Sequence, residues 1–235
     1  MRIVMLAGSP KREMSLSAAL VGELSRSLGD QEKILFDSSL LTIENTQETA
    51  AKITATLGSA EVFIVAFPLY VDAIPAHLLR LLEAIAEERR KSDPIARYLR
   101  NDDSGEVVSK PDRWPRVYAM VNCGFYESEN SRSASRMLQL WSEDACMIFA
   151  GSLLIGAGGI GPRLALGRGM GRRVGKALKM LTSSILQGEK FEAFTVEPNV
   201  SRRIYMGSGN KWWAKIARRN GIGEDALRSL TNPSR

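Results

Sequence analysis

Short apolar runs alternate with amphipathic segments along most of the chain. The runs at 3–7 and 62–66 are continuous, which is typical of strands buried on both faces of a parallel sheet. Between such runs, apolar residues recur at helical spacing, as at 20–28 and 78–85. The pattern predicts strands at 2–7, 33–37, 61–67, 116–122 and 152–155, and helices at 17–28, 47–57, 75–90, 134–149 and 174–186. A further short strand at 191–196 would lie at an edge of the sheet.

Five units of a strand followed by a helix predict an α/β fold with a doubly wound, five-stranded parallel sheet and helices on both faces. This domain would span residues 1–198. The segment 92–115 is rich in charge and proline and interrupts the alternation, so we predict an insertion that acts as a lid or a subunit contact. Residues 199–235 follow as a basic C-terminal helical extension that is not an independent domain.

Composition excludes several classes of protein. With 235 residues, 44% of them hydrophobic, the chain can bury a substantial core. No apolar run approaches the roughly 20 residues of a membrane span, and a strand begins directly after Met1. We therefore expect neither a span nor a signal peptide. Cys123 and Cys146 are the only cysteines and form no CxxC motif, which argues against disulfides and metal sites and favours a reducing cytoplasm.

Positive charge is concentrated in the C-terminal third of the chain. Residues 163–235 contain 15 basic and 5 acidic side chains, whereas residues 1–162 contain 17 and 21. This asymmetry predicts contact with an anion: a dinucleotide phosphate, an acidic subunit surface, nucleic acid or a membrane face. Residues 212–219 predict a short basic amphipathic helix that docks on its own domain or on another subunit. A membrane-surface helix is an alternative, and nucleic acid is not expected because no binding motif is present.

Two loops that follow predicted strands carry the candidate chemistry. Residues 8–17 form a small, hydroxyl-rich loop between a strand and a helix, which is typical of a phosphate cradle because helix N–H groups point at the anion. Ser17 is predicted to cap the helix. The loop contains a single glycine and no Walker A motif, so an ordinary strand-to-helix loop with a serine cap is the alternative. Residues 67–75 are aromatic and bounded by proline, and could form an apolar wall for a flat ring. Together the two loops suggest a phosphorylated flat cofactor, FMN.

Three segments resemble one known family in the same order. Residues 8–20, GSPKREMSLSAAL, resemble the GSPR-x-x-S-x-[ST] loop of the flavodoxin-like NAD(P)H-dependent FMN reductases. Residues 67–83 resemble that family's P-x-Y-x-x-x-x-P segment, and residues 122–127 resemble its third flavin loop. The resemblance covers about residues 1–190 and implies a flavodoxin-like fold. It also implies these cofactor-binding residues: Ser9, Lys11, Ser15, Leu16 and Ser17 in the first loop, Pro68, Leu69, Tyr70 and Val71 in the second, and Asn122, Cys123, Gly124 and Phe125 in the third.

The resemblance implies an FMN-dependent NAD(P)H oxidoreductase that passes electrons from NADPH or NADH to a quinone, a flavin or a similar small acceptor. It also implies a homodimer or homotetramer, with no catalytic side chain because the flavin carries the chemistry. The cysteines of the related iron–sulfur flavoproteins are absent. A non-enzymatic electron carrier, or a binding module that uses the basic C-terminal third, are alternatives.

Several remaining features have an ordinary and a functional interpretation. Residues 156–161 match the pattern GxGxxG. Three interpretations are open: a flexible turn after a strand, a dinucleotide-binding fingerprint, or a loop beside the pyridine nucleotide or the next subunit. The nearby arginines form a solvated face or recognise the 2′-phosphate of NADPH: Arg163, Arg168, Arg172 and Arg173. Cys123 is a small buried residue or a redox thiol. His77, the only histidine, has a surface or capping role or acts as an acid or base.

Overall fold

The structure is a computed structural model that describes residues 1–11, 15–92, 114–163, 168–223 and 226. The chain divides into two compact units, Met1–Asn199 and Val200–Arg235. The insertion predicted at 92–115 lies outside the described residues except at its two ends.

The first unit contains one sheet of six parallel strands in the order β2-β1-β3-β4-β5-β6. The strands are β1 (Arg2–Ala7), β2 (Glu32–Asp37), β3 (Val62–Pro68), β4 (Arg116–Asn122), β5 (Ile148–Ile155) and β6 (Phe191–Val196). The α-helices are α1 (Leu16–Ser27), α2 (Thr46–Leu57), α3 (Ala76–Ser92), α5 (Arg132–Asp144) and α6 (Arg172–Gln187). Short 3₁₀ helices are η2 (Ser38–Leu40), η3 (Ser128–Ser131) and η4 (Gly158–Arg163). This arrangement confirms the predicted α/β class and is consistent with a flavodoxin-like fold.

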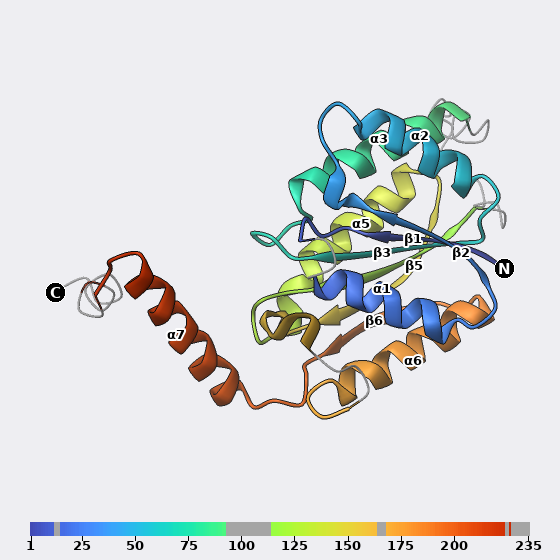
Figure 1. The fold of residues 1–235 in the computed structure, drawn as a ribbon. Coiled ribbons are helices and arrows are strands. Elements are labelled where there is room, and N and C mark those ends of the chain that lie inside the picture. The colour runs from blue at the N-terminus through green and yellow to red at the C-terminus, as the bar shows by residue number, and fades with distance from the viewer. Residues whose placement is uncertain (12–14, 93–113, 164–167, 224–225, 227–235) are drawn as a thin grey trace, which may run out of the picture. The chain divides into compact units, whose positions relative to one another are not determined.

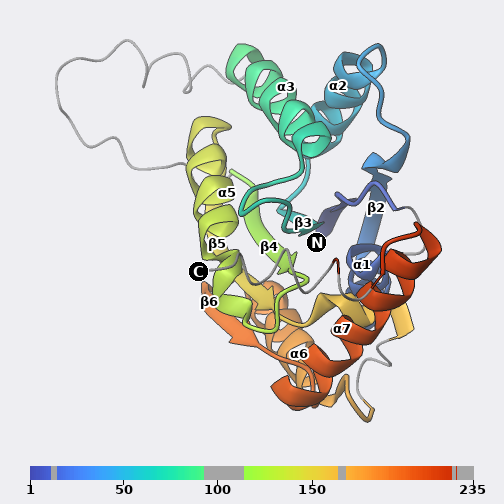
Figure 2. The same cartoon turned by 90° about the vertical axis from the view of Figure 1, so that its left-hand side faces the viewer.

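Helices cover both faces of the sheet. Figure 1 shows α2, α3 and α5 on one face and α1 and α6 on the other, and Figure 2 shows the same two layers after a quarter turn. The central strands contribute side chains to the hydrophobic cores on both faces of the sheet. In β1, Val4 and Leu6 pack in the core beneath α2, α3 and α5, whereas Ile3 and Met5 pack in the core beneath α1 and α6. Because successive strand side chains point to opposite faces, a strand between two layers must be apolar throughout.

The short edge strand predicted at 191–196 is confirmed, but it belongs to the main sheet, so the predicted count of five strands is one too small. Residues 191–196 form β6, which pairs with β5 and lies at one edge of a six-stranded sheet. The end residues of β6 are buried and its middle is exposed, and Glu192 and Thr195 interrupt its apolar residues. The strand therefore lacks the continuous apolar run that marks a central strand.

The boundary between α5 and β5 is also displaced from its prediction. The predicted helix at 134–149 ends at Asp144, and β5 begins at Ile148, before the predicted residue 152. Cys146 has a φ of 55°, which helical residues do not adopt. Arg89 holds this corner, because its buried guanidinium donates from Nε to the carbonyl of Ala145 at 2.8 Å and from Nη2 to that of Cys146 at 3.1 Å. Apolar residues continue through the corner, so periodicity alone could not locate it.

The C-terminal unit contains α7 (Arg202–Arg219), a longer helix than the predicted segment 212–219. It begins after Ser201, whose hydroxyl accepts a hydrogen bond from the backbone N–H of Ile204 at 3.3 Å. Across the described parts of both units, no helix is both long and apolar enough to cross a membrane.

Candidate functional site

The predicted loops meet where the strand order reverses. The chain runs from β1 outward to β2 and returns to β3 on the other side of β1, and ligands of open α/β sheets bind at such a switch point beyond the carboxyl ends of the strands. Two backbone hydrogen bonds join the loops there. The N–H of Gly8 donates to the carbonyl of Ala66 at 2.7 Å, and the N–H of Leu69 donates to that of Asn122 at 2.8 Å. The segments after β1, β3 and β4 therefore begin side by side.

The first loop places serine hydroxyls at the start of α1. Ser15 is the N-cap of this helix, since its Oγ accepts a hydrogen bond from the N–H of Ala18 at 3.0 Å, so the predicted cap at Ser17 is wrong by two residues. Ser9 is buried, and its Oγ accepts a hydrogen bond from the N–H of Lys11 at 3.3 Å. Leu16 is buried at the first position of the helix. Residues 12–14 of the loop lie outside the described residues.

The Ser17 side chain does not bond to the backbone of α1, as a helix cap would, but to a residue at the end of β4. Its hydroxyl donates to Oδ1 of Asn122 at 2.8 Å, across 105 residues of sequence. Both side chains are buried, with exposed fractions of 1% and 7%. This hydrogen bond ties the first turn of α1 directly to the end of β4. Sequence reasoning placed both residues in the site but did not predict that they bond to each other.

Glycine is required where the first loop leaves β1. A Cβ atom on Gly8 would lie 2.4 Å from Cδ2 of Leu78 and 3.1 Å from Cβ of Phe67. Leu78 belongs to α3, so this helix packs closely against the start of the loop. The single glycine of the predicted cradle thus lets the backbone approach α3 and β3.

The second loop forms a strained turn. Tyr70 and Ala73 exchange backbone hydrogen bonds of 3.0 and 3.1 Å, and Val71 and Asp72 between them have φ values of 49° and 58°. Positive φ is rare for β-branched residues and marks strain that the surroundings must sustain. Ser133 at the start of α5 contributes, since its hydroxyl donates to the carbonyl of Asp72 at 2.6 Å.

This turn projects apolar surface from the site. Val71 is 98% exposed and Tyr70 is 39% exposed, whereas the preceding Leu69 is buried. Partial burial raises the pKa of the Tyr70 hydroxyl, which therefore remains protonated at neutral pH. Pro68 ends β3 opposite Asn122 and is partly buried. Exposed apolar side chains on a backbone turn held from α5 form a surface suited to stacking against a ligand.

The third loop is held by the glycine-rich segment after β5. The N–H of Ala157 donates to the carbonyl of Phe125, and the N–H of Gly158 donates to that of Cys123, both at 2.6 Å. A Cβ atom on Gly156 would lie 2.1 Å from the carbonyl oxygen of Tyr126. The glycines of the GxGxxG match therefore permit contact between two loops. The segment continues into η4 rather than the α-helix that a dinucleotide fingerprint requires, so that interpretation is wrong.

The side chains of the third loop divide between core and surface. Cys123 is buried, and burial raises the pKa of its thiol, which keeps it protonated. Gly124 is exposed with no atom within 4 Å of the position of a Cβ, and Phe125 is 56% exposed. The exposed aromatic ring of Phe125 thus provides a second apolar surface, from the strand adjacent to the one that precedes Tyr70.

Two anchoring residues were not identified from the sequence. Glu197, directly after β6, accepts hydrogen bonds at Oε1 from the N–H and hydroxyl of Ser128, at 3.0 and 2.6 Å. This contact fixes the far end of the third loop. Ser133, which supports the second loop, was also missed. Each contact spans more than 60 residues of sequence, and no local spacing signals it.

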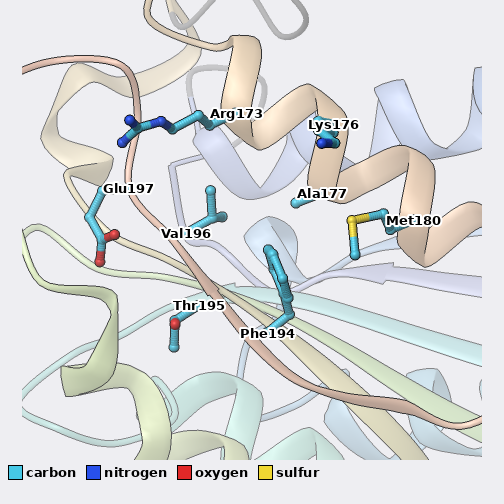
Figure 3. A pocket seen from close by; sticks show the side chains of 8 residues that line it. All are labelled: Arg173, Lys176, Ala177, Met180, Phe194, Thr195, Val196 and Glu197. Atoms are coloured by element: carbon cyan, nitrogen blue, oxygen red, sulfur yellow. The ribbon is translucent and has the colours of Figure 1, made fainter.

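His77 and the basic residues lie apart from these contacts. Nε2 of His77 lies 3.1 Å from Oγ of Ser38, a residue that directly follows β2. Burial, together with the charge of Arg80, lowers the pKa of the His77 imidazole. A hollow of about 470 Å³ lies between α6 and β6 (Figure 3). Arg173, Lys176, Met180 and Phe194 line it, and so does Glu197, the residue that anchors the third loop. The hollow is next to the β6 edge, three strands from β3, and contains none of the predicted cofactor-binding residues.

Comparisons with known proteins give a consistent fold. No family model and no curated protein sequence matches the chain. Among solved structures it is similar to an NADH:FMN oxidoreductase in its apo form, with 13% identity, 80% of this chain and 84% of that chain covered, and a TM-score of 0.50. An azoreductase from Bacillus anthracis str. Sterne is 12% identical, with 80% and 100% covered and a TM-score of 0.50. A flavone reductase is 9% identical, with 82% and 66% covered and a TM-score of 0.52. The chain therefore has the fold of the NAD(P)H-dependent FMN reductases, the family that its loops resemble.

Proposed function

We propose that the protein is an FMN-dependent NAD(P)H oxidoreductase that reduces a quinone, a flavin or a similar small acceptor. The observation that carries the proposal is the convergence at the switch point of a hydroxyl-rich helix start and two loops with exposed apolar side chains. The names of the similar solved structures, an NADH:FMN oxidoreductase and an azoreductase, support the same class of reaction.

The residues present fit the two chemically distinct parts of FMN. The first N–H groups of α1 have no partner within the helix, and its first turn contains no acidic residue, so the helix start favours an anion. Ser9, Lys11 and Ser15 would hold the phosphate end with their side chains. Leu16 and Ser17 would contribute backbone N–H groups, since the Ser17 hydroxyl donates to Asn122. Tyr70 and Val71 would contact the isoalloxazine ring from one loop, together with Pro68 and Leu69 from the end of β3. Asn122, Cys123, Gly124 and Phe125 would border the ring from the next strand.

Bound FMN would supply the chemistry, by accepting hydride from NADPH or NADH and returning electrons to the acceptor. The protein's own contribution is binding and orientation. The Ser17–Asn122 hydrogen bond would keep the proposed phosphate end and ring end of the site at a fixed separation. The apolar side chains of Val71 and Phe125 would shield a bound ring from water, and the protonated thiol of Cys123 would keep negative charge away from it.

The phosphate assignment can be tested without disturbing the fold. Aspartate is as good an N-cap as serine, so Ser15→Asp keeps the helix cap while placing a carboxylate where the phosphate would bind. We expect its FMN affinity to fall at least 100-fold, while its affinity for riboflavin, which lacks the phosphate, changes less than threefold. Ser27→Asp makes the same change at the opposite, exposed end of α1 and should leave both affinities unchanged.

The measurement is flavin fluorescence quenching, followed by anaerobic addition of NADPH to the loaded wild-type protein. Bleaching of the flavin absorbance is expected. Equal loss of FMN and riboflavin binding in Ser15→Asp would refute the phosphate assignment. Retained flavin that NADPH does not reduce would instead favour an electron carrier.

A further inference from the structure

The carboxylate of Glu197 is directed at the third loop. Its Oε1 accepts hydrogen bonds from the N–H of Ser128 at 3.0 Å and from the Ser128 hydroxyl at 2.6 Å. Glu197 also lines the hollow that contains Arg173 and Lys176, but among the described residues it forms an ion pair with neither (Figure 3). Ser128 is buried, and hydrogen bonds to an ionised acceptor are about twice as strong as neutral ones. The carboxylate is therefore used to hold Ser128.

The backbone on either side of Glu197 is fixed by contacts with two other segments. The carbonyl of Val196 accepts a hydrogen bond from the N–H of Gly156 at 3.0 Å. Oδ1 of Asn199 accepts a hydrogen bond from the N–H of Arg173, in the first turn of α6, at 3.1 Å. The carboxylate thus extends from a segment that is held on both sides, as a residue that positions another group requires.

The contact with Ser128 bears on Phe125, three residues earlier in the third loop. The Phe125 side chain is 56% exposed, so its own packing fixes it less than a core aromatic ring is fixed. Its backbone is held instead, because its carbonyl accepts a hydrogen bond from the N–H of Ala157 at 2.6 Å and the loop ends at the contact between Ser128 and Glu197. Glu197 therefore limits the positions that the Phe125 ring can take.

We propose that Glu197 is a positioning residue for the ring end of the proposed flavin site. By holding Ser128 it keeps the third loop in the conformation that places Phe125 beside the isoalloxazine ring, although Glu197 is not itself among the residues that would contact the flavin. This role rests on the proposed function, and it adds to that site a residue that follows β6, two strands from β4.

The affinities of the full-length, flavin-free protein for FMN and for riboflavin, measured by flavin fluorescence quenching, test this role. Glu197→Ala should weaken the binding of both flavins by the same factor, about tenfold, because the ring end is disturbed while the phosphate end keeps its contacts. Glu197→Gln keeps an oxygen acceptor without the charge and should stay within about threefold of the wild type. Glu192→Ala removes a carboxylate at an exposed position of β6 and should leave both affinities unchanged.

A double-mutant cycle with Phe125→Ala separates positioning from a general loss of stability. Because Glu197 acts through the Phe125 ring, Glu197→Ala should lower riboflavin affinity by less than about twofold once that ring is absent. A variant that is merely less stable would lose the same factor in both backgrounds. Ser128→Ala removes only the hydroxyl donor and should weaken both flavins by a smaller factor, about threefold. It replaces Glu197→Ala in the cycle if that protein does not fold.

Hydrogen exchange reports on the loop without any flavin. The Ser128 amide should exchange about tenfold faster in Glu197→Ala than in the wild type, because its acceptor is gone, and at the wild-type rate in Glu192→Ala. An unchanged exchange rate in Glu197→Ala would show that Glu197 does not hold the loop and would overturn the proposal.

The binding data distinguish failure of this role from failure of the proposed function. A wild-type protein that binds neither flavin would refute the proposed function, and the role of Glu197 with it. If the wild type binds both flavins, three results would each overturn the role alone: wild-type affinities in Glu197→Ala, a loss confined to FMN, or the same loss factor in the Phe125→Ala background. A loss in Glu197→Gln as large as that in Glu197→Ala would also overturn it, because charge and not the hydrogen bond would then be responsible.

Discussion

Removing the Ser17 hydroxyl should remove the side-chain hydrogen bond that connects α1 to β4 and so lower the stability of the fold. In Ser17→Ala the carboxamide oxygen of Asn122 loses its donor at 2.8 Å. The two side chains are only 1% and 7% exposed, so water cannot replace the hydroxyl without opening the site. The perturbation is small in volume and leaves the cap of the helix intact, because Ser15 makes the capping bond.

The expected cost follows from burial. A buried acceptor left without a donor costs about 1–3 kcal/mol, and the better helix propensity of alanine returns up to about 0.5 kcal/mol. The free energy of unfolding should therefore fall by about 1–2 kcal/mol. For a domain of this size that corresponds to a Tm lower by roughly 2–8 °C. FMN affinity should fall as well, since the phosphate end and the ring end of the proposed site lose their fixed separation.

Urea unfolding followed by circular dichroism measures this difference, with Ser25→Ala as the control on the same helix. The Ser25 hydroxyl makes no hydrogen bond among the described residues, so its removal should change stability by less than about 0.5 kcal/mol. A double-mutant cycle with Asn122→Leu adds a second test: the double variant should lose less stability than the two single variants together, because no buried oxygen is left unpaired. A Ser17→Ala protein as stable as the Ser25→Ala control, with additive behaviour in the cycle, would refute the reasoning.

Four shorter predictions concern contacts elsewhere in the chain. Arg89→Met removes donors to two backbone carbonyls at the end of α5 and should cost about 3 kcal/mol in urea unfolding; a cost below about 1 kcal/mol would contradict it. Gly156→Ala places a methyl group 2.1 Å from a backbone oxygen, so it should lower both Tm and FMN affinity. By NMR, His77 should titrate below its ordinary pKa of 6.5, so its contribution to stability is complete above that pH and is lost as the pH falls through the lower folded value. Cys123 and Cys146 are buried, so both should react with a thiol reagent only after denaturation.

The helices and strands of this fold are predicted from the sequence better than the tertiary contacts that connect them. Strands such as β3 were evident because a continuous apolar run of this length, bounded by turn residues, is typical of a strand buried on both faces. The edge strand β6 was predicted at its observed bounds but was not counted in the sheet, because Glu192 and Thr195 interrupt its apolar residues. The corner at Cys146 was not predicted, because its left-handed backbone lies within an apolar stretch. In the site, the loops were identified by residue type and position. Their supports were not, because Ser17 with Asn122 and Ser128 with Glu197 meet only through tertiary structure.

The turn at Val71 has a consequence for how this protein can change. A valine at a φ of 49° destabilises the folded chain relative to glycine or asparagine, and its 98% exposed side chain returns no packing energy within the protein. Selection for thermostability alone would therefore replace it. Populations under such selection should acquire Gly or Asn at this position early, at the expense of the flavin contact that we propose for Val71. If Val71 makes that contact, heat tolerance and flavin binding select for different residues at this turn.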